Sequence, residues 1–558
     1  MRVKRTFAVF LAALMIMTCF AGCGDSKKEV QEKALVIAEA DFSQSFNPFF
    51  AKSVSDCELT QQTQVYLVNK DREGNVIMKG SKGEVIPFEK KDYTYHTPCD
   101  IKLAERGDGT MDITFKLRKD IIFSDGVPMT ADDIIFSLYV FSDPAYDGSK
   151  TVCYLPIEGM ESYRASSEGG AVNISGIEKT GDYTVKIHAL TTDAAILSDL
   201  DIAIAPLHHY GDTSLYDYEN NKFGFTKGDL SKVRSKSGIP LGAGPYKFDK
   251  IKNKIAYLTA NENFYLGSPK IKSIEYRAFS EEAMVTGVLE GTVDVAEPSA
   301  SEATLMQIEA NNENGELSGE MLHAEIIPGA VYGYIGIDPR NVCMGEDPAS
   351  EASKNLRRAI ATILSVYRDV AVTSYFGENA QIAEFDFAEA GGFSYREAAE
   401  PEGSYGAALS TALSYFRAAG YTIVNGRLEG APEGTEPECT AYVNGDGAGN
   451  NPCYGILLSA AEALNSVGFT LTIKDINDAK EMWDAVSDGT AEIWCAESMS
   501  APGAMAAYFA VDSATMLPVY LASDLFVFSP EKVNLETVPD NQTVFYNYKN
   551  ELYNLELK

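Results

Sequence analysis

Residues 112–141 constrain the fold of this chain more than any other stretch. Apolar and polar side chains alternate over residues 113–117, which is the period of a half-buried β-strand. Asp125-Gly126 supplies a turn. Thr130 and Asp133, three residues apart, approximate a capping box, and apolar residues follow at helical spacing. The stretch therefore predicts a strand, a turn and a capped amphipathic helix.

The first 23 residues have the pattern of an export signal. Three cations precede an apolar run over residues 7–20. This run of about 14 residues is shorter than the roughly 20 that a membrane-spanning helix needs, and its flanks are those of a cleaved peptide. Phe20-Ala21-Gly22-Cys23 resembles a bacterial lipobox, so we expect Cys23 to be lipidated and to become the mature N-terminus. An ordinary secreted protein is the alternative.

Length and charge limit the class of protein. A chain of 558 residues exceeds what one hydrophobic core usually covers, so at least two lobes are expected. The formal net charge of −33 makes nucleic acid a poor partner. The charge mildly favours cationic ligands, but the solubility of a cell-surface protein is the explanation that we prefer.

Seven of the nine cysteines follow Cys23, and an odd number leaves at least one unpaired. No Cys-x-x-Cys pair occurs, so we expect no metal cluster. Cys439 and Cys453 bracket a loop rich in glycine and asparagine. In an exported protein they either form a local disulfide or remain free.

Catalytic motifs are missing from the sequence. None of the five histidines lies in His-Glu-x-x-His, and no Gly-x-Ser-x-Gly occurs. His208-His209 is expected on a strand, where adjacent side chains point to opposite faces and rarely share a metal ion. Gly242-Ala243-Gly244 lacks the rest of a nucleotide-binding motif. We predict no enzyme, no cofactor and no metal. An exported hydrolase with paired carboxylates is the rival hypothesis.

The string over residues 112–141, with Phe115-Lys116-Leu117-Arg118 and Phe123-Ser124-Asp125-Gly126, resembles the signature of the family 5 extracellular solute-binding proteins. These are the peptide and nickel receptors of ABC importers. Further segments resemble the family's motifs in the same order, from about residue 34 to 500 and again at 517–520. They include 203–210, 241–248, 261–271, 288–296, 354–361, 412–421 and 458–476.

The resemblance implies an α/β, two-lobed periplasmic-binding-protein-like fold of the large peptide-receptor type, with an extra subdomain in the first lobe. The expected segments are a signal peptide (1–22), a lipid-anchored tether (23–33), the first lobe (34–65, 201–297 and 511–558), the extra subdomain (66–200) and the second lobe (298–510).

In the family, a strand after "G-x-x-D" leads to a tryptophan and an acidic residue at the ligand cleft. The corresponding run here is residues 489–498. A gapped alignment makes Glu497, near Trp494, the carboxylate that holds the α-ammonium of a peptide paired with the strand backbone. The ungapped alignment, which we prefer, places Ser498 where the tryptophan belongs and makes Trp494 a core strand residue.

Four further ligand candidates are Phe46 and Asn47 in the first loop and Tyr332 and Tyr334 at the lobe crossing. Aromatic side chains suit a concave site that shields a ligand from water. Core packing is the alternative, because the chain has 30 tyrosines and 27 phenylalanines. The candidate ligand-binding set is Phe46, Asn47, Tyr332, Tyr334, Trp494, Glu497 and Ser498.

The resemblance implies a lipid-anchored protein on the extracellular face of the cell membrane. It would capture oligopeptides or dipeptides by closing two lobes and present them to the permease subunits of an ABC importer. Nickel chelates and sugars are alternative ligands, and a monomer is expected. The segment between Tyr508 and Leu517 is much shorter than in the family. A receptor-derived surface scaffold or sensor with weakened ligand capture is therefore an alternative function.

Overall fold

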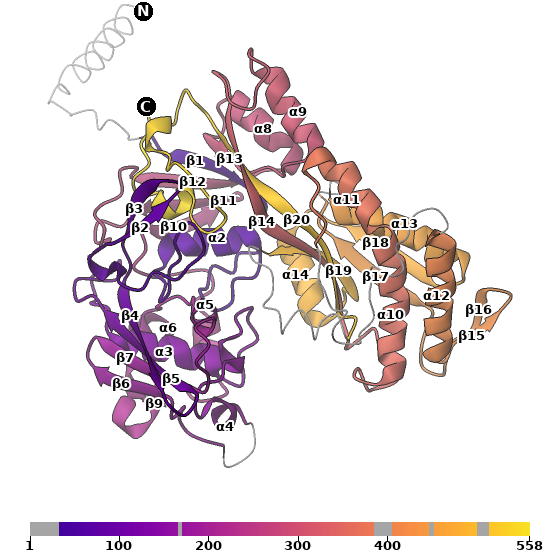
Figure 1. Cartoon of the computed structure of the whole chain (residues 1–558), viewed down its shortest axis with the longest axis horizontal. Coiled ribbons are helices and arrows are strands. Elements are labelled where there is room, and N and C mark those ends of the chain that lie inside the picture. The colour runs from indigo at the N-terminus through magenta and orange to yellow at the C-terminus, as the bar shows by residue number, and fades with distance from the viewer. Residues whose placement is uncertain (1–32, 166–169, 384–403, 446–450, 499–512) are drawn as a thin grey trace, which may run out of the picture. The chain divides into compact units, whose positions relative to one another are not determined.

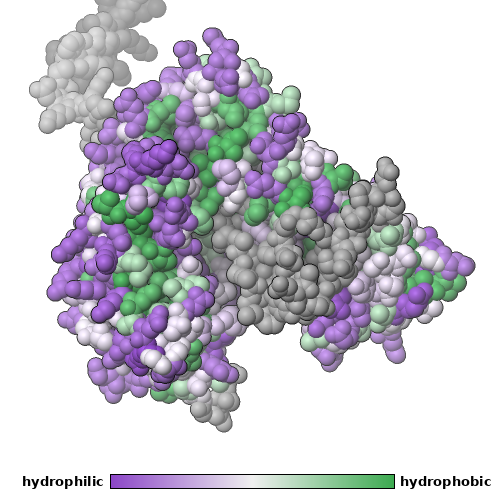
Figure 2. Space-filling view, in the orientation of Figure 1, coloured by the Kyte–Doolittle hydropathy of each residue, from purple (hydrophilic) through white to green (hydrophobic). Residues whose placement is uncertain are grey.

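The computed structural model describes residues 33–165, 170–383, 404–445, 451–498 and 513–558. The predicted signal peptide and Cys23 lie outside these residues. Within the described ranges, no helix is both long and apolar enough to cross a membrane. Figure 2 shows hydrophilic residues over much of the visible described surface, as the acidic composition predicts.

The principal feature is a mixed ten-stranded sheet, in which β1 pairs in parallel with β12 and β13, and β14 pairs antiparallel with β20. In spatial order the strands are β10 (Tyr246–Lys252), β11 (Ile255–Ala260), β12 (Ser273–Ala278), β1 (Leu35–Glu39), β13 (Val295–Ala296), β20 (Met516–Phe528), β14 (His323–Ile337), β19 (Ile493–Ser498), β17 (Glu438–Val443) and β18 (Thr470–Asp475).

Two long strands, β14 and β20, run side by side through both halves of this sheet (Figure 1). Their pairing shifts register between Ile327 and Val331, where Pro328 cannot donate a ladder hydrogen bond and Gly329 has a φ of +72°. On one side of this interruption, Ile327 and Phe526 pack in the core of β1 and β10–β12. On the other side, the strands pack against the helices that follow β14. The interruption therefore lies where the chain passes between two hydrophobic cores.

The first core contains β1, β10–β12, β13 and the C-terminal segment. A neighbouring cluster packs α8 (Glu281–Leu289) and α9 (Glu302–Asn311) against β13 and β20. Helix α2 (Val54–Thr63) follows the loop after β1 and contacts β10.

A separate four-stranded antiparallel sheet, in the order β4-β5-β7-β6, packs with α3 (Ala131–Ser142) in its own core. Its strands are β4 (Cys99–Arg106), β5 (Thr110–Leu117), β7 (Thr184–Ala189) and β6 (Ile177–Gly181). The predicted strand, turn and capped helix are confirmed. Asp133 accepts a hydrogen bond from the Thr130 N–H at 2.9 Å, and the Thr130 side chain caps the first turn of α3.

The second core is built by α10 (Glu351–Val366), α11 (Arg368–Phe376), α12 (Ser404–Ala418) and α13 (Pro452–Ser466), with strands of the large sheet. Gly420, with a φ of +106°, follows the end of α12, a conformation that glycine adopts readily. Helix α14 (Ala479–Asp488) forms a smaller cluster with β17 and β19.

The remaining elements are short. They include α4 (Met160–Arg164), α5 (Ile196–Asp199), α6 (Leu207–Tyr210), α7 (Ser231–Arg234), η8 (Tyr548–Glu551) and the paired strands β2 (Glu84–Phe88) with β3 (Lys91–Tyr95), β8 (Tyr216–Asp217) with β9 (Lys222–Phe223), and β15 (Thr422–Val424) with β16 (Arg427–Gly430).

The expectation that His208 and His209 lie on a strand is wrong, because both belong to α6, which begins after Pro206. His208 hydrogen-bonds Asp125 at 2.8 Å, and His209 hydrogen-bonds the Ile239 carbonyl at 2.9 Å. The two imidazoles therefore serve separate local contacts.

Candidate ligand-binding site

Three of the predicted ligand residues share one face of the sheet. In the pairing of β14 with β19, Tyr334 lies opposite Ala496 and Gly336 lies opposite Trp494. Because alternate strand residues face the same side, Tyr332, Tyr334 and Trp494 form one aromatic strip. The rings of Tyr332 and Tyr334 stack with centroids 6.2 Å apart. Burial raises the pKa of both tyrosines, so both hydroxyls are neutral at physiological pH.

The indole of Trp494 is held from two directions. It lies against the backbone of Gly336, where an added Cβ would come within 2.3 Å of the ring. It also packs against a cluster of Tyr442, Met482 and Ala485, which covers this face with α14. The structure places Trp494 in strand β19 with its side chain half-buried.

Glu497 lies on the opposite face of β19 from Trp494. The Tyr520 hydroxyl donates a hydrogen bond to the Glu497 carboxylate across Gly333, which pairs with both residues. Desolvation raises the pKa of Glu497, although part of its side chain reaches solvent. Two residues that the gapped alignment would bring to one ligand are thus separated by the sheet.

Among the residues that the structure describes, one edge of β19 has no partner strand over its second half. Strand β17 pairs with Ile493 and Trp494 only, whereas β14 continues to pair as far as Ser498. Within the described ranges, no strand pairs with residues 495–498 on the β17 side. Nothing is described of the Ser498 side chain, but its backbone completes the pairing with Tyr332.

The direction of the backbone groups identifies the donors and acceptors on this open edge. The Asp338 N–H donates to the Glu492 carbonyl at 2.8 Å, so Asp338 turns toward β19. By alternation, Trp494, Ala496 and Ser498 turn their backbone groups toward β14. Cys495 and Glu497 therefore present their N–H and C=O groups at the open edge. An extended chain can pair with such groups.

Phe46 and Asn47 do not join this strip. Phe46 is fully buried and lies 5.2 Å from Phe248 between ring centroids. The Asn47 side chain donates to the Val233 carbonyl at 2.7 Å and accepts from the Phe49 N–H at 3.0 Å. Both side chains therefore stabilise the loop that follows β1, Phe46 by packing and Asn47 by hydrogen bonds.

A buried charged cluster is the main feature that sequence reasoning missed. The Lys549 ammonium contacts Glu58 of α2 at 2.5 Å and also pairs with Glu297, which follows β13. The side chains of Lys549, Glu58 and Glu297 are only 11%, 8% and 15% exposed. The Tyr548 hydroxyl also donates to Glu297. This cluster joins the C-terminal segment to α2 and to the end of β13.

The cluster contains more carboxyl groups than cations. Burial and the Glu58 charge together raise the pKa of Glu297 to about 7, although the Lys549 charge opposes the rise. Burial and Glu58 also hold the pKa of Glu39 well above its usual range. Asp524, next to the interruption in β20, has its pKa raised by burial to about 6 and interacts with Lys549. No sequence signal identifies this set, since Lys549 and Glu58 are 491 positions apart.

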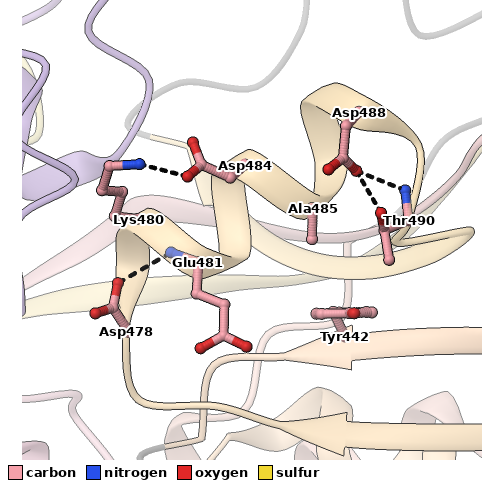
Figure 3. A pocket seen from close by; sticks show the side chains of 8 residues that line it. All are labelled: Tyr442, Asp478, Lys480, Glu481, Asp484, Ala485, Asp488 and Thr490. Carbon is pink, nitrogen blue, oxygen red and sulfur yellow. Dashed lines mark hydrogen bonds and ion pairs between the residues drawn. The ribbon is translucent and has the colours of Figure 1, made fainter.

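A surface groove of about 390 Å³ lies between Tyr442 of β17 and the acidic side of α14 (Figure 3). Two of its carboxylates serve the helix itself. Asp478 accepts from the Glu481 N–H at 2.9 Å, and Asp484 pairs with Lys480. Over the described part of the chain, no three His, Cys, Asp or Glu side chains are grouped to hold a metal ion.

A ten-stranded sheet shared by two cores, with two long strands passing between them, defines the two-lobed periplasmic-binding class. Residues 102–513 match the sequence model of the bacterial extracellular solute-binding proteins, family 5 middle region. The chain therefore belongs to the family 5 extracellular solute-binding proteins, whose members bind solutes.

Similar proteins support both the family and the fold. The oligopeptide-binding protein AppA of Bacillus subtilis is 23% identical over 398 residues, which span 69% of this chain and 61% of AppA. The structure of AppA in complex with a nonapeptide matches with a TM-score of 0.63 at 16% identity, over 94% of this chain and 99% of that one. NikZ from Campylobacter jejuni in complex with Ni(L-His) matches with a TM-score of 0.58 at 16% identity and the same coverage. These structural matches confirm the predicted fold class.

Proposed function

We propose that this protein is the substrate-binding component of an ABC importer, that it captures oligopeptides, and that it performs no chemistry. The observation that carries the proposal is the open edge of β19 beside the aromatic strip. Cys495 and Glu497 present two sets of backbone groups there. Backbone pairing recognises any extended peptide, and it leaves side-chain specificity to the surrounding surfaces.

The neighbouring side chains suit a peptide. Tyr332, Tyr334 and Trp494 offer a rigid aromatic surface close to the same strand. Glu497, on the other face, offers a carboxylate to an α-ammonium group at the end of the open edge. A bound ammonium would favour the ionised carboxylate and lower the pKa that desolvation raises in the free protein.

Closure of the lobes would use the interruption in β14 and β20. Pro328 and Gly329 break the pairing opposite the 522–524 segment, so small backbone rotations there move one core relative to the other. Ligand affinity would then come from contacts made in the closed state. The extra subdomain at 66–200 and the second lobe at 298–510 remain predictions from the sequence, and the break at Pro328 and Gly329 that we propose as the hinge lies inside the second of these segments.

The cellular setting is also a proposal. Export through the leader and lipidation of Cys23 would hold the protein at the extracellular face of the membrane, as a monomer beside the permease subunits. Labelling with a fatty-acid analogue tests this. Wild-type protein is expected to incorporate the label and Cys23→Ser is not. Labelling of both would contradict lipidation at Cys23.

The experiment for ligand capture separates the contribution of the Glu497 backbone N–H to peptide affinity from that of the Glu497 side chain. Glu497→Pro removes one outward N–H without removing a bond to β14, and proline is tolerated at a strand edge. Glu497→Ala removes the same carboxylate but keeps the N–H. In calorimetric titration with a defined peptide pool, Glu497→Pro is expected to lose about fivefold more affinity than Glu497→Ala, since a hydrogen bond is worth about 1 kcal/mol.

Equal affinities for the two variants would contradict pairing at this edge. Saturable binding of nickel chelates or sugars, with no response to peptides, would show that the ligand belongs to one of those classes and is not a peptide. A flat response to all three would favour the receptor-derived scaffold or sensor.

A further inference from the structure

The segment that follows β14 holds the C-terminal end of α14. The Arg340 guanidinium donates to the Val486 carbonyl at 3.1 Å and to the Ser487 carbonyl at 3.5 Å. The Asn341 side chain donates to the Gly489 carbonyl at 2.9 Å. Because the last carbonyls of a helix have no partner within the helix, these two side chains satisfy groups that α14 cannot satisfy by itself.

Asp338 fixes the orientation of both side chains. Its carboxylate is 3% exposed and accepts from the Arg340 guanidinium through both oxygens, each at 2.9 Å. It also accepts from the Asn341 amide at 3.0 Å. The Asp338 N–H donates to the Glu492 carbonyl at 2.8 Å, which ties this residue to the chain entering β19. A two-point contact between guanidinium and carboxylate sets direction as well as distance, so Asp338, Arg340 and Asn341 form a rigid clamp.

Helix α14 in turn holds the indole of Trp494. Met482 and Ala485 of α14 are buried in one small cluster with Tyr442, and Val486 and Trp494 pack against that cluster. Figure 3 shows Ala485 pointing toward the Tyr442 ring. Val486 therefore receives the clamp through its carbonyl and contacts the cluster through its side chain. Because the cluster is small, the position of α14 depends on the clamp as well as on apolar packing.

We propose that Arg340 and Asn341 are positioning residues for peptide capture, which set the Trp494 indole by fixing the C-terminal end of α14. This role rests on the proposed function of β19 and the aromatic strip. Neither residue needs to touch the peptide. An indole that is already fixed does not have to be ordered when the peptide binds, and affinity is higher for that reason.

Strand β14 connects the clamp to the other parts of the site. Along its length lie the interruption at Gly329, the Tyr334 ring and the close approach of Gly336 to Trp494. The clamp follows directly, at residues 338–341. A rotation at the interruption therefore moves the strip and the clamp together, and the aromatic surface keeps its shape while one core moves relative to the other.

The two tryptophans of the chain allow a direct test, because Trp483 lies in α14 and Trp494 in β19. In a Trp483→Phe background only Trp494 emits. Arg340→Lys keeps the positive charge but cannot make the forked contact. Without ligand, this variant is expected to shift the Trp494 emission to longer wavelength and to increase its quenching by acrylamide. Its affinity for the peptide pool, measured by calorimetric titration, is expected to fall several-fold. Asn341→Ala leaves the fork in place and is expected to act in the same direction.

The matched control is Arg277→Lys. Arg277 of β12 also donates two hydrogen bonds to a carboxylate two residues earlier, that of Glu275, at 3.0 and 2.6 Å. It donates a third to the Thr292 carbonyl at 2.9 Å. This contact lies beside the first core, away from α14. Arg277→Lys is expected to lower stability as Arg340→Lys does, while the Trp494 emission and the peptide affinity stay as in the parent protein.

Unchanged Trp494 emission in Arg340→Lys would overturn the positioning of the indole. A shifted emission with unchanged peptide affinity would overturn the role in capture, and so would an equal loss of affinity in Arg277→Lys. A wild-type protein that binds no peptide would contradict the proposed function and with it the role in capture. The emission is measured without ligand, so it tests the positioning of the indole separately.

Discussion

The indole of Trp494 lies flat against Gly336, its partner across the β14–β19 ladder, in space that any larger residue would occupy. A second glycine of the same strand, Gly333, makes the same accommodation for the Tyr520 ring on the opposite face, where an added Cβ would lie 2.2 Å from it. These two glycines therefore let large rings cross both faces of β14 close to the open edge of β19.

Gly336→Ala tests whether the aromatic face serves the ligand. The added Cβ would lie 2.3 Å from Trp494, so the indole must move. We expect about 1–3 kcal/mol lower stability in denaturant titrations, as overpacking usually costs, and about tenfold weaker peptide binding. Gly333→Ala, which displaces Tyr520 instead, is the matched variant. If it weakens binding more than Gly336→Ala does, the ligand contacts the other face.

Lys549→Met tests the buried charged cluster. The change leaves Glu58 and Glu297 without their cation in a buried site, and breaking a buried pair in this way costs about 3–5 kcal/mol. Chemical denaturation should show this loss.

The control for Lys549→Met is Lys91→Met. Lys91 pairs with Asp540 at 2.5 Å, but both side chains are more than half exposed. No measurable change in stability is expected there. Equal losses of stability in the two variants would show that the buried Lys549 cluster stabilises the protein no more than an exposed ion pair does.

The charged cluster also predicts how stability depends on pH. The pKa of Glu297 is raised to about 7 in the folded protein from an ordinary value of 4.5, so folding favours its protonated form. Its contribution to stability is complete below the unfolded pKa and is lost as pH rises through about 7. The pKa of Asp524 is raised to about 6, so this group changes stability with pH in the same direction. The Lys549 charge acts against both shifts, because it lowers the pKa of each carboxyl group.

Between about pH 5 and about pH 8, the thermal midpoint of the wild-type protein should therefore fall. Glu297→Gln keeps the shape of the side chain without the titration, so its midpoint should fall less over the same range. A variant whose pH profile runs parallel to the wild type would refute the assignment to Glu297.

Thr130→Ala tests the local feature that the sequence predicts most directly. The Thr130 side chain caps α3, and replacing such a cap by alanine costs about 1 kcal/mol. Denaturant titrations should show this loss with peptide affinity unchanged. A stability equal to that of the wild type would mean that the Asp133 carboxylate alone satisfies the helix end.

Sequence reasoning succeeds where a structure depends on close neighbours in the chain. The strand, turn and capping box around Thr130 involve residues three or four positions apart, and all three are present. Trp494 and Glu497 are three residues apart, and in strand β19 they face opposite sides of the sheet.

The rest of the site depends on contacts that no local pattern encodes. Lys549 contacts Glu58 across 491 positions of a chain with 80 acidic residues, and no pattern near either residue predicts the pair. The open edge of β19 is a property of the sheet order, which only the assembled fold defines.

The most direct test of peptide capture is mass spectrometry of the small molecules that remain bound through purification under native conditions. The protein should then be stripped by unfolding, refolded and re-exposed to a peptide pool. We predict a series of short peptides in the first spectrum and recovery of the same class after re-exposure. A nickel chelate or a sugar in the first spectrum, or a refolded protein that retains nothing from the peptide pool, would contradict the account.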